Sequence, residues 1–327
     1  MNPRRRRFTA AAAAAAATFA LGLAHAQTGP SGKTVRILVG FPPGQATDTV
    51  ARMLAEQLSS ALGQSVIVEN KPGQGGSVVL GQLARAPNDG THVTLSALAA
   101  YTVNPHLYKN VAYDTLRDFE PIGTVADLPL ALVVNPALPV KTVAELVAYA
   151  KANPTQLSHP SSGNGTLSHL LMEDFKRRAG ITITHVPYQG SAKAMTDLVA
   201  GQVQVGLDTL AVTSPLVEGG KLRMLAVGTR ERLPFMPTVP TIAELGFPGF
   251  EAVAWIALSA PAGTPLEWRQ RINEAVQTAL KTPEFQQKLR AMGAIPRPGS
   301  VQDFGEFLRA EHARWGTMVR ESGVKVD

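Results

Sequence analysis

The chain has 327 residues, of which 45% are hydrophobic and 17% are charged, and it contains no cysteine. This composition fits an α/β protein of one large or two medium domains, and it excludes disulfide bonds, thiolate metal sites and a cysteine nucleophile. The formal net charge is +6, from 31 basic and 25 acidic residues, but four of the basic residues are Arg4 to Arg7. The remaining 27 basic residues nearly balance the acidic ones, so we expect no nucleic-acid partner.

The N-terminal segment has the pattern of an export signal. The basic stretch "MNPRRRRF" is followed by the apolar stretch "TAAAAAAATFALGLA", which is too short for a membrane span, and then by "AHA" before Gln27. We therefore predict a signal peptide over residues 1–26, cut after Ala26, and a periplasmic protein. The arginines before Phe8 allow twin-arginine export, and an ordinary Sec signal explains the segment equally well.

Strand-like and helix-like segments alternate in the first part of the chain. In chain order they are a strand at 35–40, a helix at 47–62, a strand at 65–70, a helix at 77–85 and a strand at 91–97. This β-α-β-α-β order favours a parallel sheet with helices on both faces. The β-prone stretch 121–135 follows with no helix beside it, and we interpret it as the chain crossing into a second unit.

The alternation then restarts. Thr142 and Glu145 form a capping-box pattern before a helix at 142–154. The further segments are a strand at 157–163, helices at 166–180 and 191–202, strands at 181–188, 203–209, 222–229 and 251–261, and helices at 265–281, 283–291 and 301–322. We predict an α/β fold of two lobes, each a mostly parallel sheet flanked by helices, with residues 33–127 and 252–327 in the first lobe and 128–251 in the second.

Six strand-exit loops are rich in Gly, Ser, Thr and Asn and nearly free of Lys and Arg. They are "FPPGQATD", "NKPGQGGS", "SALAAYTVNP", "PSSGNGTLSH", "VPYQGSA" and "LDTLAVTS". Ligands of open α/β sheets bind beyond the carboxyl ends of the strands, and the N-terminus of a helix attracts an anion. A small carboxylate could therefore be held without an arginine. Each single loop is equally compatible with ordinary turn chemistry, and only the set of six indicates a binding cleft.

The known catalytic patterns are missing. "GQGGS" is neither a phosphate-binding P-loop nor a dinucleotide fingerprint, and "PSSGNG" is not a nucleophile elbow. His159, His169 and His185 lie near Ser161 and Ser162 in sequence but on separate elements, so we interpret them as structural. No metal-ligand spacing is present, and we expect no metal, no cofactor and no enzymatic activity. Asp48 and Asp208 are most simply explained as a first-turn acid and a turn residue.

Taken together, the chain resembles the Bug family, the periplasmic substrate-binding proteins of tripartite tricarboxylate transporters. The matching stretches run over nearly the whole chain after the signal: "FPPGQATD", "VENKPGQGGS", "NPHLYKNVAYDTLRDFEPI", "SSGNGTLSHL", "THVPYQGSAKAMTDLVAGQVQVGLD" and "ERLPFMPTVPTIAELGFPGF". The resemblance implies a type II, flytrap-like fold with two crossover strands. It also implies that backbone N–H groups, hydroxyls and bridging waters hold the ligand, instead of a salt bridge.

The resemblance also implies roles for individual residues. The Phe41 carbonyl would seat bridging waters, Ala46 N–H and the stretch 161–166 would hold the carboxylate, and Asp208 would support the waters. Gln45 stands where the family usually has a second glycine, and His169 matches a family histidine that we interpret as structural. The predicted ligand-binding set is Phe41, Gly44, Gln45, Ala46, Thr47, Asp48, Ser96, Ala97, Ala100, Ser161, Ser162, Gly163, Asn164, Gly165, Thr166, Tyr188 and Asp208.

The function that these residues favour is the capture of a small carboxylate by a monomeric periplasmic protein. Its partners would be the membrane subunits of a tripartite transporter or a sensor kinase. The alternative is a secreted serine hydrolase or transferase that uses Ser161 or Ser162. A ligand-sensing domain of a transcription regulator is disfavoured by the export signal and by the lack of a helix-turn-helix. The identity of the carboxylate stays open among hydroxy, amino, tricarboxylic and aromatic acids.

Overall fold

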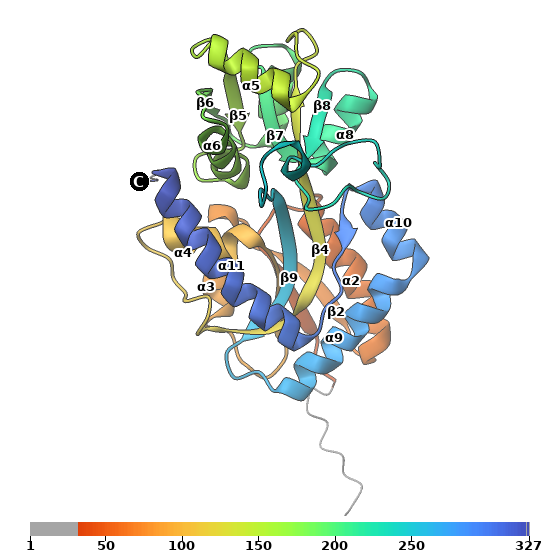
Figure 1. The fold of residues 1–327 in the computed structure, drawn as a ribbon. Coiled ribbons are helices and arrows are strands. Elements are labelled where there is room, and N and C mark those ends of the chain that lie inside the picture. The colour runs from red at the N-terminus through yellow and green to blue at the C-terminus, as the bar shows by residue number, and fades with distance from the viewer. Residues whose placement is uncertain (1–31, 325, 327) are drawn as a thin grey trace, which may run out of the picture.

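The computed structural model describes residues 32–324 and 326, and it has two lobes joined by two long strands (Figure 1). The predicted signal peptide lies outside the described residues. The first lobe holds a sheet in the order β10-β4-β9-β3-β1-β2, and the second holds strands β5 to β8. In the part of the chain that the structure describes, no helix combines the length and apolarity of a membrane span.

The first lobe begins with the predicted β-α-β-α-β unit. Its elements are β1 (Val35–Val39), α2 (Ala46–Leu62), β2 (Val66–Asn70), α3 (Ser77–Leu83) and β3 (His92–Ala97). Strand β1 pairs in parallel with both β2 and β3. Helix α2 buries Val50, Leu54 and Leu58, a four-residue spacing that forms one apolar face against the sheet. Sequence periodicity therefore predicted this unit correctly to within two residues at each boundary.

Strands β4 (Phe119–Val134) and β9 (Val253–Pro261) connect the lobes. The first half of β4 pairs with β9, and its second half pairs with β7 and β8. All of these pairs are antiparallel, as are β3 with β9 and β10 with β4. The expected parallel arrangement thus holds for β1, β2 and β3 and for β5 and β6, whereas the crossing strands make the rest of the sheet antiparallel.

The second lobe is built between the two crossings. It contains α5 (Val143–Ala152), β5 (Ser158–Ser161), α6 (Leu167–Ala179), β6 (Thr184–Pro187), α7 (Ser191–Val199), β7 (Val205–Thr209), α8 (Leu210–Glu218), β8 (Arg223–Val227) and η3 (Ala243–Leu245). Thr142 caps α5 by accepting from Glu145 N–H at 3.1 Å. The interpretation of "LDTLAVTS" as a loop is wrong, because α8 begins at Leu210, directly after β7.

The remaining elements return to the first lobe. They are α9 (Leu266–Lys281), α10 (Pro283–Ala291), β10 (Ile295–Pro296) and α11 (Val301–Ser322). The three helices follow the predicted helices closely, whereas the short strand β10 was not predicted. The interpretation of "SALAAYTVNP" as a loop is also wrong beyond Ala97. This segment forms a π-helical turn, η2 (Ala99–Val103), followed by the short helix α4 (Asn104–Leu107).

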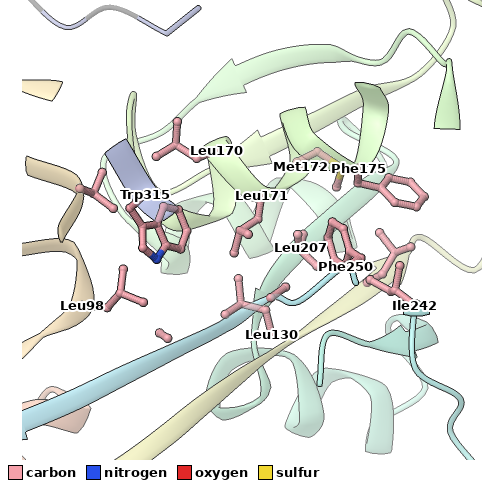
Figure 2. Close-up of a cluster of buried hydrophobic side chains, with 14 of the residues drawn as sticks. Leu98, Leu130, Leu170, Leu171, Met172, Phe175, Leu207, Ile242, Phe250 and Trp315 are labelled. Atoms are coloured by element: carbon pink, nitrogen blue, oxygen red, sulfur yellow. The ribbon is translucent and has the colours of Figure 1, made fainter. Parts of the chain in front are cut away.

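Hydrogen bonds and an apolar core join the lobes at the hinge. Leu130 N–H donates to Ala252 O at 2.9 Å, Ala252 N–H to Gly228 O at 2.8 Å, and Gly228 N–H to Leu130 O at 2.8 Å. Beside these three hydrogen bonds, one buried cluster includes Leu98 and Trp315 of the first lobe and residues of α6 such as Leu170 and Leu171 (Figure 2). Helix α6 therefore packs against α11 across the boundary between the lobes.

Candidate ligand-binding site

The loop after β1 is organised by the buried carboxylate of Asp48. Asp48 accepts from Gly44 N–H at 2.8 Å, from Arg52 Nε at 3.0 Å and from Asn70 Nδ2 at 2.9 Å. Burial raises the pKa of this carboxyl, but the hydrogen bonds from Arg52, Gly44 and Asn70 outweigh it and leave the pKa below its usual value. Asp48 therefore holds the loop in shape, and its carboxylate faces the protein's own donors.

The other residues of this loop surround the start of α2. Asn70 Nδ2 also donates to Phe41 O at 2.9 Å, which uses one of the two lone pairs of that carbonyl. Helix α2 begins at Ala46, Thr47 is buried, and Gln45 is exposed with no side-chain cap hydrogen bond. The first N–H groups of a helix have no partner within the helix, so the start of α2 offers donors to an anion.

A second loop of the first lobe, which the prediction left out of the site, packs on the β1 exit. A Cβ at Gly76 would lie 3.1 Å from Ala100 Cβ, 3.4 Å from Ser96 Oγ and 3.9 Å from Phe41 Cε2. Ser96 and Ala100 are fully buried beneath it, and Ala97 is partly buried. Ser96 Oγ has no hydrogen-bond partner among the described residues.

The conformation of this second loop is strained at Gln74. Gln74 has a φ of 45°, the only positive φ of a non-glycine residue in the described range, and left-handed backbone of this kind is found often at functional sites. Asn104 Nδ2 fixes the loop by donating to Gln74 O at 3.0 Å and Ser77 Oγ at 2.8 Å. The side chain of Gln74 is exposed. The strained backbone at Gln74 marks this loop as a candidate part of the site, and the residue types alone did not indicate it.

In the second lobe, the loop after β5 is a network of short internal hydrogen bonds. Ser161 Oγ contacts Gly163 O at 3.0 Å and His185 Nε2 at 2.7 Å. Thr166 Oγ1 donates to Gly163 O at 2.7 Å and lies 3.1 Å from Ser168 Oγ. Ser168 Oγ in turn accepts from Ser162 N–H at 3.1 Å. The hydroxyls of this loop are thus used to shape it, and Thr166 donates its proton within the loop.

Gly165 and Asn164 complete this loop. Asn164 is exposed, whereas Gly165 is buried with a φ of 73°. Gly165 N–H donates to His169 Nδ1 at 3.1 Å. A Cβ at Gly165 would overlap Leu107 Cδ2 of α4, so this glycine lies directly against the first lobe. Only a residue without a side chain fits here, both for its backbone and for this contact.

Tyr188 and Asp208 lie beside this loop in the second lobe. Tyr188 N–H donates to Ser161 O at 3.0 Å, and its hydroxyl is hydrogen-bonded to Asp197. Asp208 accepts from Ser191 Oγ at 2.6 Å and from Thr209 N–H at 2.7 Å. Burial raises the pKa of Asp208. Asp208 thus ties the start of α7 to the end of β7.

The strands that precede these loops end near the point where β4 crosses from one lobe to the other. Val39 of β1 pairs with Leu95, and Ala97 pairs with Ile256, which faces Ala126 just before β4 leaves the first lobe. On the other side, Thr209 at the end of β7 pairs with Leu130. In the described part of the chain, no hydrogen bond or ion pair joins the loop at 41–48 to the loop at 161–166.

Two sizeable cavities lie elsewhere. One of about 590 Å³ lies between α8, β8 and the segment 235–239, and one of about 560 Å³ lies along the hinge against β10 and α11. Neither is lined by a residue of the predicted site. No group of three or more His, Asp or Glu among the described residues is arranged to hold a metal ion.

The alternative of a serine hydrolase rests on the contact between Ser161 and His185. Ser161 is only 1% exposed, which leaves no path for a substrate to its hydroxyl. Burial and the neighbouring histidines lower the pKa of His185 to about 4, so it is a weak base near neutral pH. No carboxylate among the described residues is hydrogen-bonded to His185 to orient it. The pair therefore has the geometry of a structural contact.

The two lobes, the paired crossing strands and the strand-exit loops define the fold of a two-lobed periplasmic binding protein. The model of the TctC family, the tripartite tricarboxylate transporter family receptor, matches residues 50–324. This chain belongs to that family, which consists of solute-binding proteins and not of enzymes. It is 35% identical to Protein BugT of Bordetella pertussis over 302 residues, with 92% of each chain covered. The predicted family is thereby confirmed.

Solved structures agree with this assignment. Rpa4515 of R. palustris, solved with adipate, is 38% identical with a TM-score of 0.80, over 89% of this chain and 98% of that one. MatC of Rhodopseudomonas palustris, solved with bound malate, is 31% identical with a TM-score of 0.75, over 88% and 98% of the two chains. The predicted two-lobed architecture is confirmed by this similarity.

Proposed function

We propose that this chain is an exported receptor that captures a small carboxylate between its two lobes. The observation that carries the proposal is that each lobe begins a helix at a strand-exit loop, α2 after β1 and α6 after β5, and that the loop before α6 lies against Leu107 of the first lobe. Each loop uses its own polar side chains to hold its shape. The N–H groups at the two helix starts are then free to bind one anion from both sides.

The ligand class follows from the family and from the charge of the loops. Related structures hold adipate and malate, and the loops at 41–48 and 161–166 contain no Lys or Arg. Backbone donors at helix starts suit a carboxylate that is held by hydrogen bonds and bridging waters. All residues of the predicted set from Phe41 to Asp208 stay part of the proposed site. Asp48 and Asp208 support the two loops, and the buried Ser96, Ala100 and Ser161 shape the site without presenting their side chains to the ligand.

Binding would proceed by closure about the hinge. Only when the lobes approach can both helix starts contact the same carboxylate. We propose the boundaries at 127/128 and 251/252 as the limits of the moving parts, and the nearby hydrogen bond from Leu130 N–H to Ala252 O supports this choice. Small-angle scattering should then give a smaller radius of gyration with ligand.

The deciding experiment has two steps. Native mass spectrometry of the freshly purified chain looks for a retained acid, and calorimetry then measures adipate, malate, citrate and the retained compound. We expect at least one carboxylate to bind and its uncharged amide to fail, because an amide lacks the charge that the helix starts favour. Equal binding of acid and amide would contradict a carboxylate site.

Export and partnership are proposed with the same function. We infer that residues 1–26 are removed, and N-terminal sequencing of the periplasmic protein should begin at Gln27. Detection of Arg4 to Arg7 on the purified periplasmic protein would contradict this. The loaded monomer would deliver its carboxylate to the membrane subunits of a tripartite transporter, or report it to a sensor kinase. Deletion of each candidate partner, followed by uptake measurement, separates the two.

A further inference from the structure

Three histidine rings are stacked beneath the loop at 161–166. His159 of β5 and His185 of β6 are register partners in neighbouring strands, and their ring centroids lie 5.0 Å apart. His169 of α6 covers His185, with centroids 3.7 Å apart and an interplanar angle of 11°. We call these three residues the histidine stack. Two of them contact the loop directly, His169 through Gly165 N–H and His185 through Ser161 Oγ.

The charges around the stack cannot balance three imidazolium ions. Glu173 is the carboxylate that faces it, with Oε1 3.4 Å from His159 Nε2 and 3.9 Å from His169 Nε2. Glu173 is already paired with Lys176 at 2.6 Å. The other charged or titratable groups on the surrounding elements already have partners of their own. On α4, α6 and α11, Asp174 pairs with Arg177 and Arg178, Glu321 pairs with Arg177, and His106 contacts His312 O. Beside β7, Lys193 pairs with Asp197, and Asp208 accepts from Ser191 and Thr209.

The rings are accordingly held neutral at pH 7. Burial is the main cause that lowers the pKa of His159, His169 and His185. In addition, His159 Nδ1 is buried without a hydrogen-bond partner among the described residues. A stack of rings in contact also disfavours a second positive charge once the first is present.

His169 must be neutral for the loop to keep its shape. Its Nδ1 accepts the Gly165 N–H, and this requires a ring whose proton is on Nε2, the atom that faces Glu173. Protonation of Nδ1 would place two donors opposite each other. Gly165 cannot turn aside easily, because it is buried against Leu107 and has a left-handed backbone. The loop itself would then have to move.

We propose that His169 is a positioning residue for the ligand loop, and that protonation of the histidine stack in acid displaces Gly165 and weakens carboxylate binding. This inference rests on the proposed function, because it assumes that the loop at 161–166 binds the carboxylate. Protonation of the stack would thus lower the affinity for the ligand in an acidic medium, although the histidine side chains do not touch the ligand.

The matched variant is His169→Asn. The Asn side-chain oxygen stands close to the position of Nδ1 and accepts the same N–H, but it does not titrate. Calorimetry with adipate at pH 7.5, 6.5, 5.5 and 4.5 compares the two proteins. The titration of adipate itself is common to both, so the ratio of their affinities isolates the histidine.

We expect affinities within about threefold of each other at pH 7.5, because both side chains are neutral acceptors. Below the pKa of His169, the wild type should lose about tenfold per pH unit relative to the variant. Parallel pH profiles of the two proteins would overturn the proposal.

A second measurement uses the wild type alone and needs no ligand. Nuclear magnetic resonance follows the Gly165 amide proton and the His169 ring protons as the pH is lowered. We expect both to shift with one midpoint below about 6.5, the ordinary histidine pKa. A Gly165 amide that stays constant while His169 titrates would overturn the proposal. Failure of adipate to bind the wild type at pH 7.5 would instead count against adipate as the ligand, and this titration would still decide the coupling.

Discussion

Gly165 of the second lobe lies directly against the side chain of Leu107 in the first lobe, with no room for a Cβ between them. The contact joins the loop before α6 to the short helix α4, and α4 in turn begins with Asn104, which fixes the Gln74 loop. The second-lobe half of the proposed site is therefore seated on α4, which holds the Gln74 loop of the first lobe through Asn104. A substitution at Gly165 therefore tests whether this contact between the lobes matters for binding.

Gly165→Ala should weaken carboxylate binding by tenfold or more. The left-handed backbone costs alanine about 1–2 kcal/mol, and the added methyl group would overlap Leu107. Calorimetry measures the affinity, and scattering measures the compaction. The matched control is Gly63→Ala, which has a φ of 64° and open space around its Cβ, and which should leave affinity unchanged. Adding Leu107→Ala to Gly165→Ala should restore part of the loss; equal affinity of all three variants would contradict the contact's role.

Thr166→Val should reduce affinity by about threefold to tenfold. In this structure the Thr166 hydroxyl donates to Gly163 O, and a neutral hydrogen bond contributes about 0.5–1.5 kcal/mol. A direct bond to the ligand carboxylate would be a charged one, of about 1.5–3 kcal/mol, and would raise the loss to about tenfold to a hundredfold. Thr166→Ser keeps the donor and should bind normally. Calorimetry on both variants thus separates a role in loop shape from direct contact, and unchanged affinity of the valine variant would exclude both.

Asp48→Asn should loosen the first-lobe loop. One carboxylate oxygen would become an NH₂ group that faces donors from Gly44, Arg52 or Asn70. Loss of a buried acceptor of this kind costs about 1–3 kcal/mol, and thermal melting should report it together with weaker binding. Arg52→Gln is the comparison variant, because the Arg52 side chain is 55% exposed and its loss leaves the Gly44 and Asn70 donors to Asp48 in place, so it should cost less stability than Asp48→Asn. Similar losses in the two variants would mean that the ion pair alone matters.

Much of this arrangement could be predicted from the sequence because it depends on local periodicity. The apolar spacing in "TVARMLAEQL" predicted the helix α2, and Gly180 marked the end of α6, where its φ is 60°. Helix α8 escaped prediction because Thr213, Ser214 and Pro215 have the composition of a loop. Helix α8 packs on β4, and the sequence of a single segment does not contain that contact.

The histidine stack depends on contacts that are distant in sequence. His159 and His185 meet only because β5 and β6 pair in one particular register, and His169 joins them through the rotation of α6 about its axis. The sequence alone indicates three separate structural histidines and does not predict that their rings stack. Likewise, the internal bonding of Thr166 and the strain of Gln74 follow from loop geometry, which residue types leave open.

Stability in acid should depend on Glu173. Burial raises the pKa of this carboxyl, but hydrogen bonds from His159 and Lys176 outweigh it and lower the pKa to about 2. Because the folded-state pKa lies below the ordinary value of 4.5, the stabilisation is complete above about pH 4.5 and is lost as the pH falls toward 2. Urea unfolding should find Glu173→Gln less stable than the wild type at pH 5, with a smaller difference at pH 3. A difference that is the same at both pH values would contradict this linkage.

Gly228→Ala should disturb the hinge itself. A Cβ at Gly228 would overlap Ala252 Cβ and lie 2.6 Å from Ala252 O, so the hydrogen bonds that link Gly228 with Leu130 and Ala252 could not all persist. Overpacking of this kind costs about 1–3 kcal/mol, and unfolding experiments should show it. Because the displaced segments are the ones about which the lobes would close, the decrease in radius of gyration on ligand binding should be smaller as well.

Gly81→Ala, in α3 and 3.2 Å from Ala112 Cβ, provides a control without a left-handed φ, and it should preserve compaction. A Gly228 variant that unfolds earlier but compacts fully with ligand would place the hinge elsewhere.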